Sequence, residues 1–350
     1  MLARCRRQRQ ELVCRAGPAR RGAWTSSDSR VTAMTASIPR RSGTPPPDSG
    51  RGAPLMRAPV MLETEGWSDY ALLDSGNGRK LERYGRYRIV RPEEQAIWSP
   101  RRPDREWDAA DATFVGIGEE DADGRWRYRT PLGETWPLAY DGIRFLGRFT
   151  AFRHVGVFPE QATHWEWLKA RIATAPRPAR VLNLFGYTGL ASLVAAQAGA
   201  EVTHIDASKK AIGWARENQE ASGLRELPIR WICEDAKKFV AREERRGNHY
   251  DGIILDPPKF GRGPKGEVWD LFADLPEMMR ACRRLLAPEP LFLILTAYSI
   301  RASFLSIHEL AGECLAGIGG VIESGELVLQ EEGGGRALST SLFSRWWRDG

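Results

Sequence analysis

The chain has 350 residues, enough for two domains, and no apolar run approaches the roughly 20 residues of a membrane-spanning helix. The formal net charge is +6, but it is unevenly distributed. Residues 1–53 hold 11 arginines and three acidic residues, a net charge of +8, and the rest of the chain has a net charge of −2. A uniformly basic nucleic-acid-binding body is therefore not supported. The lack of a long apolar run predicts a soluble protein. The five cysteines include no CxxC pair, which argues against a disulfide framework or a zinc site and predicts a metal-free protein of a reducing compartment, the cytoplasm.

Residues 1–54 are rich in Arg, Ser, Pro and Gly and show no apolar period, so they predict a disordered tail. Three interpretations stay open. The tail resembles organelle transit peptides, it could bind RNA non-specifically, or it is upstream sequence included by the choice of start codon. We favour the last interpretation, because Met34, Met56 and Met61 could each begin a chain.

Residues 55–150 show short apolar or aromatic runs broken by turn residues every eight to fifteen positions. The stretch GEEDADG between FVGI and RWRYR is typical of a hairpin loop. This pattern predicts a small, mostly β domain.

From residue 151 onward, apolar strands alternate with helical segments of 11–19 residues. Such alternation predicts parallel βαβ units with helices on both faces, and hence a Rossmann-like, seven-stranded, mostly parallel sheet in a domain spanning 151–350. The predicted strands cover 178–185, 201–206, 229–233, 250–256, 291–298, 326–330 and 338–347. The predicted helices cover 189–199, 208–222, 235–247, 268–286 and 301–315.

The loop NLFGYTGL follows the first of these strands, where a ligand sits in sheets of this kind. Gly186 and Gly189 bracket a tight turn into a helix, which lets the backbone approach a ligand closely. Ser192 occupies the third glycine position of the dehydrogenase G-x-G-x-x-G pattern, so a dinucleotide site is not indicated. The alternative is a purely structural turn.

The next two strands each end at an acid. Asp206 can accept hydrogen bonds from a ribose diol, or cap the following helix together with Ser208. Asp235 can meet an adenine amino group, or cap its own helix. The fourth strand ends in Asp256-Pro257-Pro258-Lys259-Phe260, where two prolines force the chain out of the sheet.

This order of loops resembles the class I S-adenosylmethionine-dependent methyltransferases over roughly residues 150–345. The resemblance implies S-adenosylmethionine as cofactor, and a methyl-transfer floor in the loop from Asp256 through Pro257, Pro258, Lys259 and Phe260. The cofactor-binding residues that it implies are Phe158, Gln161, Asn183, Phe185, Gly186, Tyr187, Thr188, Gly189, Asp206, Ala207, Ser208, Asp235, Ala236 and Asp256.

Within that superfamily, DPPKF looks most like the bacterial large-subunit ribosomal RNA methyltransferases that make 5-methylcytosine or 7-methylguanine. The segment GVFPEQ, with Glu160 and Gln161, is similar to a G-x-x-x-D-Q segment of that family. The arginines that follow in the family are replaced by Ala162 and Trp165. After the fifth strand, LTAYSIRAS lacks the cysteine nucleophile of the cytosine-C5 enzymes, and a serine is too weak a substitute.

We therefore expect methylation of a base nitrogen, with ribosomal RNA the favoured substrate and no membrane partner. In-line transfer needs alignment, which Asp256 and a proline carbonyl can supply by accepting hydrogen bonds from an amine. Phe260 or Tyr187 could stack on a flipped-out base, whereas His154 and His164 are expected to be structural. The alternatives are a methyltransferase of a protein side chain or small molecule, and a non-catalytic RNA- or ribosome-binding protein that keeps the cofactor pocket.

Overall fold

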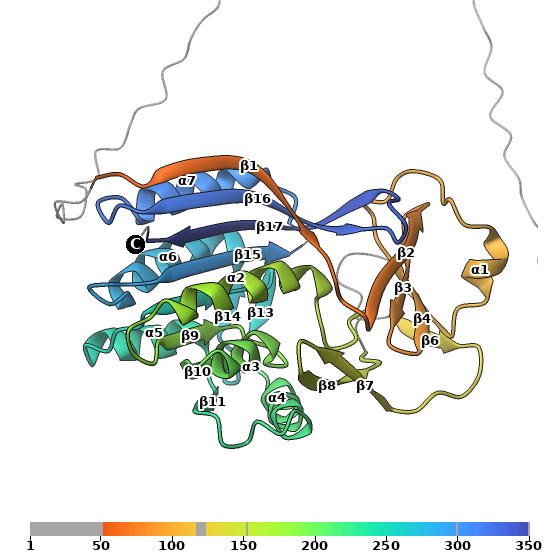
Figure 1. Cartoon of the computed structure of the whole chain (residues 1–350), viewed down its shortest axis with the longest axis horizontal. Coiled ribbons are helices and arrows are strands. Elements are labelled where there is room, and N and C mark those ends of the chain that lie inside the picture. The colour runs from red at the N-terminus through yellow and green to blue at the C-terminus, as the bar shows by residue number, and fades with distance from the viewer. Residues whose placement is uncertain (1–51, 117–123, 152, 299, 349–350) are drawn as a thin grey trace, which may run out of the picture. The chain divides into compact units, whose positions relative to one another are not determined.

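A computed structural model describes residues 52–116, 124–151, 153–298 and 300–348 of the chain (Figure 1). Nearly all of the predicted N-terminal tail therefore lies outside the described residues. None of the helices in the described ranges is long and apolar enough to cross a membrane.

The main sheet is mixed and mostly parallel, in the strand order β1-β16-β17-β15-β12-β9-β10-β11. Strand β17 runs antiparallel to both of its neighbours, and the other described pairings are parallel. The strands are β1 Leu55–Thr64, β9 Arg180–Leu184, β10 Glu201–Asp206, β11 Ile229–Cys233, β12 Gly252–Leu255, β15 Phe292–Tyr298, β16 Val321–Gln330 and β17 Ala337–Trp347.

The α/β fold with a Rossmann-like, mostly parallel sheet is confirmed, but the predicted count of seven strands is wrong by one. Leu55–Thr64, predicted to belong to the small β domain, pairs in parallel with β16 and is an edge strand of the main sheet. The partner strand could not be predicted from this mostly exposed sequence, because the pairing joins segments more than 260 residues apart.

Six helices and one 3₁₀ turn connect or precede the strands. They are η1 Pro159–Gln161, α2 Ala162–Ala173, α3 Leu190–Gln197, α4 Lys209–Ala221, α5 Ala236–Arg245, α6 Leu271–Leu285 and α7 Phe304–Cys314. The predicted helix over 268–286 begins at Leu271 instead. Its first three residues form β14 (Val268–Asp270), which pairs with β13 (Phe260–Arg262) in a hairpin directly after the DPPK segment.

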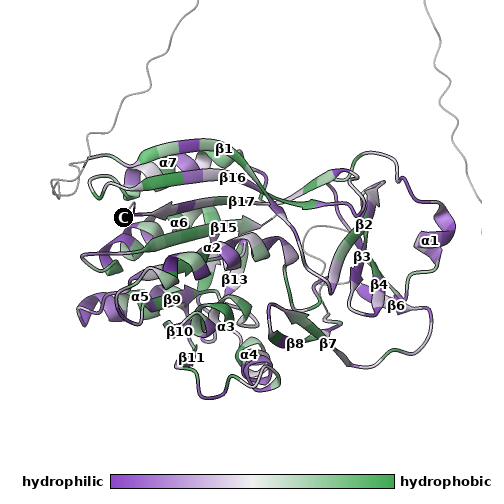
Figure 2. Ribbon diagram, in the orientation of Figure 1, coloured by the Kyte–Doolittle hydropathy of each residue, from purple (hydrophilic) through white to green (hydrophobic). Residues whose placement is uncertain are grey.

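Two hydrophobic cores lie on opposite faces of the main sheet. On one face, α2 and α3 pack on Val181, Ile254 and Ile294. On the other face, α5, α6 and α7 pack on residues such as Leu182 and Leu255. These directly follow Val181 and Ile254 in their strands and so point to the opposite side of the sheet. Figure 1 shows α2 in front of the sheet and α6 and α7 behind it, and in Figure 2 β15 is predominantly hydrophobic, as a strand buried on both faces must be.

The small β region, predicted between residues 55 and 150, begins after β1. Its five-stranded sheet has the order β2-β3-β4-β5-β6, and a separate hairpin is formed by β7 and β8. The elements are β2 Tyr70–Gly76, β3 Arg79–Tyr84, β4 Tyr87–Pro92, α1 Asp104–Asp108, β5 Ala112–Val115, β6 Arg125–Tyr128, β7 Thr135–Tyr140 and β8 Ile143–Arg148.

Buried polar groups join this region to the rest of the fold. The Ser75 N–H and hydroxyl both donate to the Glu331 carboxylate, at 3.0 and 2.6 Å. Arg91 pairs with the fully buried Glu82 and also donates to the backbone carbonyl of Arg153 at 3.0 Å, so it holds the segment that leads into the predicted site.

Candidate active site at the carboxyl edge of the sheet

The four predicted loops meet at one edge of the main sheet. Strands β12, β9, β10 and β11 are consecutive neighbours and all parallel, so their carboxyl ends lie side by side. The loops that follow them therefore converge, as ligand-binding loops do in open α/β sheets.

The glycine-bearing loop after β9 has an unusual backbone. Phe185 and Tyr187 both lie in the left-handed region, with φ of 59° and 52°, and Gly189 follows with φ of 85°. Such angles at bulky residues are rare and concentrate at functional sites. A Cβ added at Gly186 would lie 2.3 Å from the His204 ring, so the loop runs against β10 at a point where only glycine fits.

Asp206 braces this loop from the end of β10. Its Oδ2 accepts the Tyr187 N–H at 2.9 Å and its Oδ1 accepts the Ser208 N–H at 2.8 Å. Burial raises the pKa of the Asp206 carboxyl, against the opposing effect of these two bonds. Each oxygen keeps a lone pair for a ribose hydroxyl, and the cap of α4 is supplied by Ser208, whose hydroxyl accepts the Ala211 N–H.

Asp235 is the N-cap of α5, the alternative that the sequence left open. Its Oδ1 accepts the Lys238 N–H at 3.0 Å, and the residue is only 7% exposed. Its neighbour Ala236, the first residue of α5, is also buried. An adenine contact at this position remains a prediction.

Asp256 follows β12 and is held by Gln161 from the segment before α2. The Gln161 side-chain amide donates to Asp256 Oδ2 at 3.1 Å, and its carbonyl oxygen lies 3.5 Å from the Thr296 hydroxyl on β15. Burial raises the pKa of Asp256 to about 7, with a further contribution from Glu160. Glu160 itself is buried beside the Ser341 hydroxyl, so of the pair predicted to close the site only Gln161 touches Asp256.

The two prolines after Asp256 differ in surroundings. Pro257 is buried, whereas Pro258 is exposed and its carbonyl accepts the Trp269 indole N–H at 2.7 Å. The Pro258 carbonyl is therefore already engaged by a donor from within the chain. Within the described residues, no hydrogen bond to the Pro257 carbonyl is present. Beyond them, Lys259 is partly buried and Phe260 is 46% exposed.

A cavity of about 50 Å³ opens between the glycine loop, the segment before α2 and Asp256. Eight predicted residues line it: Phe158, Gln161, Asn183, Phe185, Gly186, Tyr187, Thr188 and Asp256. The other predicted residues do not line this cavity: Gly189, Asp206, Ala207, Ser208, Asp235, Ala236, Pro257, Pro258, Lys259 and Phe260. Six lining residues were missed: Gly156, Val157, Trp165, Leu190, Ala191 and Ile254.

Some of these omissions could have been avoided. Leu190 and Ala191 open the helix after the glycine loop, and Ile254 lies two residues before Asp256. Strand alternation alone would have placed Ile254 on the α2 side of the sheet. Gly156 and Val157 open the GVFPEQ segment that the sequence analysis singled out, whereas Trp165 carried no comparable signal, because its approach depends on how the segment before the sheet folds back.

Several aromatic rings cluster around Phe158, which lines the same cavity as Asp256. The Phe158 ring centroid lies 5.0 Å from that of His154, 5.3 Å from that of Tyr298 and 5.9 Å from that of Tyr187. Burial lowers the pKa of His154 to about 3 and lowers that of the fully buried His164 as well. Neither histidine is placed to exchange protons near neutrality, in keeping with the structural role expected of them.

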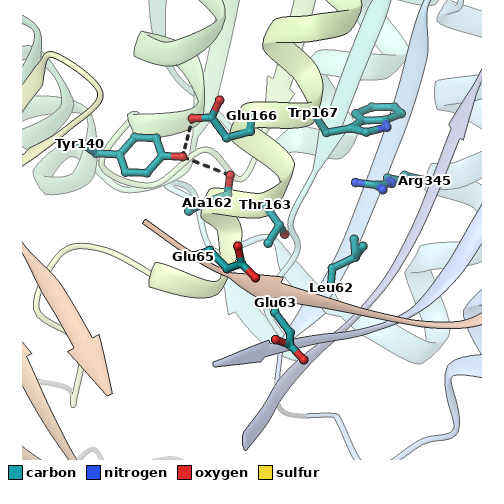
Figure 3. Close-up of a pocket in the computed structure, with 9 residues that line it drawn as sticks. All are labelled: Leu62, Glu63, Glu65, Tyr140, Ala162, Thr163, Glu166, Trp167 and Arg345. Atoms are coloured by element: carbon teal, nitrogen blue, oxygen red, sulfur yellow. Dashed lines mark hydrogen bonds between the residues drawn. The ribbon is translucent and has the colours of Figure 1, made fainter. Parts of the chain in front are cut away.

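A second, larger cavity of about 460 Å³ lies between β1 and α2 (Figure 3). Figure 3 shows Glu63 and Glu65 on the β1 side and Glu166 on α2, where Glu166 accepts the Tyr140 hydroxyl at 2.7 Å. None of the predicted site residues lines this cavity. The candidate active site is therefore the cavity beside Asp256, which eight of the predicted residues line.

The family model for S-adenosylmethionine-dependent methyltransferases matches residues 118–314, more than half of the chain. The chain belongs to this family. The methyltransferase is also similar to a crystal structure of an S-adenosylmethionine-dependent methyltransferase from Agrobacterium tumefaciens. The two are 64% identical with a TM-score of 0.83, and the match covers 85% of this chain and 96% of that one.

Curated relatives match the methyltransferase over shorter stretches. A ribosomal RNA large subunit methyltransferase K/L from Shewanella frigidimarina is 32% identical over 149 residues, which are 42% of this chain and 20% of that protein. A ribosomal RNA large subunit methyltransferase I from Aeromonas salmonicida is 42% identical over 82 residues, 23% of this chain and 21% of that protein. The matched part of the chain thus spans about a fifth of the length of these relatives.

The family assignment confirms that the protein is an S-adenosylmethionine-dependent enzyme. The residues at the sheet edge fit this cofactor. Gly186 lines the cavity at a point where the loop packs directly on His204, and Asp206 offers spare acceptor capacity beside the same loop. The predicted role of each individual residue remains a prediction.

Proposed function

We propose that this methyltransferase modifies a base nitrogen in RNA, with ribosomal RNA as the favoured class, by in-line transfer at the loop from Asp256 to Phe260. The observation that carries the proposal is the pair of acceptors left at this loop. The Asp256 carboxylate and the Pro257 carbonyl are adjacent in the chain, and Gln161 holds the carboxylate in place. Two fixed acceptors suit a nitrogen that bears hydrogen atoms.

Methyl transfer is a displacement in which a nitrogen–carbon bond forms as a sulfur–carbon bond breaks. S-adenosylmethionine supplies the methyl group. The Asp256 carboxylate and the Pro257 carbonyl accept hydrogen bonds from the N–H groups of this nitrogen. They orient it so that its lone pair faces the cofactor side of the cavity. Asp256, with its pKa raised to about 7, is also suited to take up the proton that the methylated nitrogen releases.

Carbon methylation at cytosine C5 is not favoured by the surroundings of the cavity. That reaction needs a thiolate to attack C6, and none of the residues that line the cavity is a cysteine. Cys233 is the last residue of β11, where its thiol contacts the Ala207 carbonyl, and Cys282 and Cys314 are buried with raised pKa values.

RNA as substrate is supported by the names of the curated relatives and by the form of the loop. The exposed Phe260, four residues after Asp256 in the same loop, presents a ring on which an extruded base can stack. The near-neutral charge of residues 54–350 favours the second candidate, a protein side chain or small molecule. The acceptor pair would serve a side-chain amide equally well.

The experiment is transfer of tritiated methyl groups from S-adenosylmethionine into a lysate of a strain that lacks the protein, followed by RNase or protease digestion. We expect label that RNase removes, and a methylated-nitrogen nucleoside in the hydrolysed RNA. Asp256→Asn is the matched inactive control. Label that survives RNase and is lost to protease would establish the second candidate, and 5-methylcytidine would contradict a nitrogen target.

A further inference from the structure

The loop that carries Asp256 has few backbone N–H groups with which to hydrogen-bond to the rest of the fold. Pro257 and Pro258 have no N–H, and the Asp256 N–H makes only a long, 3.4 Å contact with the Leu184 carbonyl. A loop so poor in donors must be held through its own carbonyls by donors from elsewhere.

Those donors come from the β13–β14 hairpin and the start of α6. The Trp269 indole N–H reaches the Pro258 carbonyl at 2.7 Å, and the Leu271 N–H reaches the Lys259 carbonyl at 3.0 Å. Both donors sit just beyond the turn of the hairpin, so the chain returns to support the loop that it has just left.

The same tryptophan also contacts the glycine-bearing loop after β9. Its ring centroid lies 4.8 Å from that of Phe185, at an interplanar angle of 56°, and Trp269 is only 3% exposed. Phe185 lines the cavity and has the left-handed backbone described above. One side chain thus contacts both the loop that presents the acceptors and the loop that borders the cofactor side.

We infer that Trp269 is a positioning residue for methyl transfer. By binding the Pro258 carbonyl it sets the direction of the Pro257 carbonyl one residue earlier, and by packing on Phe185 it sets the distance between the two loops. Transfer is sensitive to displacements of about 1 Å, so loss of this hold should lower turnover more than it lowers binding. This inference rests on the proposed role of the Asp256 loop.

The competing explanation is that Trp269 merely fills the core. The chain supplies a matched control in Trp346, which is 1% exposed and donates its indole N–H to the Gly319 carbonyl at 2.8 Å. Trp346 pairs with Leu293 near the start of β15, whereas the site lies beyond the carboxyl ends of the strands. Trp269→Phe and Trp346→Phe therefore remove the same kind of bond from a buried tryptophan at opposite ends of the sheet.

The test measures both variants in the full chain. With RNA from the deletion strain as substrate, Trp269→Phe should lower kcat about tenfold while KM and the Kd for S-adenosylmethionine stay within about threefold. It should also accelerate tryptic cleavage after Lys259, followed by mass spectrometry, about fivefold. Trp346→Phe should leave kcat and this cleavage rate unchanged even where its Tm falls.

If Trp269→Phe does not fold, 3-benzothienylalanine at position 269 keeps the bicyclic ring and removes only the N–H. Equal kcat and equal cleavage rates in the two tryptophan variants would overturn the inference. Faster cleavage with unchanged kcat would overturn it too, because the loop would be held without consequence for transfer. Asp256→Asn distinguishes the two levels, since full activity of that variant would refute the proposed function itself.

Discussion

Asp256 combines a fixed position with an unusual acidity. Gln161 binds one of its oxygens, while burial and Glu160 raise its pKa to about 7. An ordinary aspartate is ionised throughout the physiological range, whereas here the carboxylate forms only as the pH rises through about 7. A protonated Asp256 loses an acceptor, so under the proposed mechanism the ionised form is the active one.

We therefore expect kcat to rise about tenfold between pH 6 and pH 8, the range over which a group with a pKa of about 7 goes from mostly protonated to mostly ionised. Asp256→Asn should lower kcat about a hundredfold, leave the Kd for S-adenosylmethionine nearly unchanged and abolish this limb of the profile. Single-turnover assays across the range measure it. A flat wild-type profile would contradict the role of the carboxylate.

Replacing Asp206 should mainly weaken cofactor binding, whereas replacing Asp256 should mainly lower turnover. Asp206 accepts the Tyr187 and Ser208 N–H groups and is the predicted ribose ligand, so Asp206→Ala removes support from the glycine loop as well as a ligand. We expect the Kd for S-adenosylmethionine, measured by titration calorimetry, to rise at least tenfold, or about 1.4 kcal/mol. Asp235→Ala is the informative comparison, because Asp235 is seen to cap α5 and its cofactor contact is only predicted.

At the scale of elements, the glycine loop shows what a motif can and cannot predict. Glycines after a strand predicted a tight turn, and the turn is there. That Phe185 and Tyr187 would share the left-handed conformation was not predictable, because nothing in the chemistry of bulky aromatic residues favours it. The conformation is imposed by the Asp206 carboxylate, the Ile205 carbonyl and packing against Trp269.

Gly186→Ala tests how closely this loop and β10 are fitted. The new Cβ would lie 2.3 Å from the His204 ring, so we expect a loss of about 1–3 kcal/mol in the free energy of unfolding together with weaker cofactor binding. Gly213→Ala in α4 is the control, since no atom lies within 4 Å of its added Cβ and alanine favours the helix by about 0.5–1 kcal/mol. Urea unfolding of both variants measures the difference. Equal stabilities would mean that the loop can move away from β10.

At the scale of the whole molecule, local pattern predicted the βαβ elements and the edge at which their loops meet. It failed where partners are far apart in sequence. Neither the pairing of β1 with β16 nor the approach of Trp269 to Pro258 leaves a periodic signal, because each depends on tertiary contact rather than on residue spacing. The same holds for Arg91, which gave no sign in the sequence that it would be buried.

Arg91 offers a test of whether the small β region supports the site. It forms a bidentate pair with Glu82, whose side chain is 0% exposed, and donates to the Arg153 carbonyl in the segment that leads to Phe158. Removing the arginine takes away the charged partner of a buried carboxylate and leaves it the Tyr70 and Tyr84 hydroxyls as donors, and breaking a buried pair in this way typically costs about 3–5 kcal/mol. Because the Arg153 segment loses its anchor at the same time, cofactor affinity should fall with stability.

Arg129 provides the matched surface pair, since it binds Asp111 at 3.0 Å with its own side chain 53% exposed. We expect Arg91→Met to lose about 3–5 kcal/mol in urea unfolding and to weaken S-adenosylmethionine binding, and Arg129→Met to lose less than about 1 kcal/mol with binding unchanged. If Arg91→Met destabilises the chain without affecting binding under conditions where it stays folded, the small β region stabilises the fold but does not shape the site.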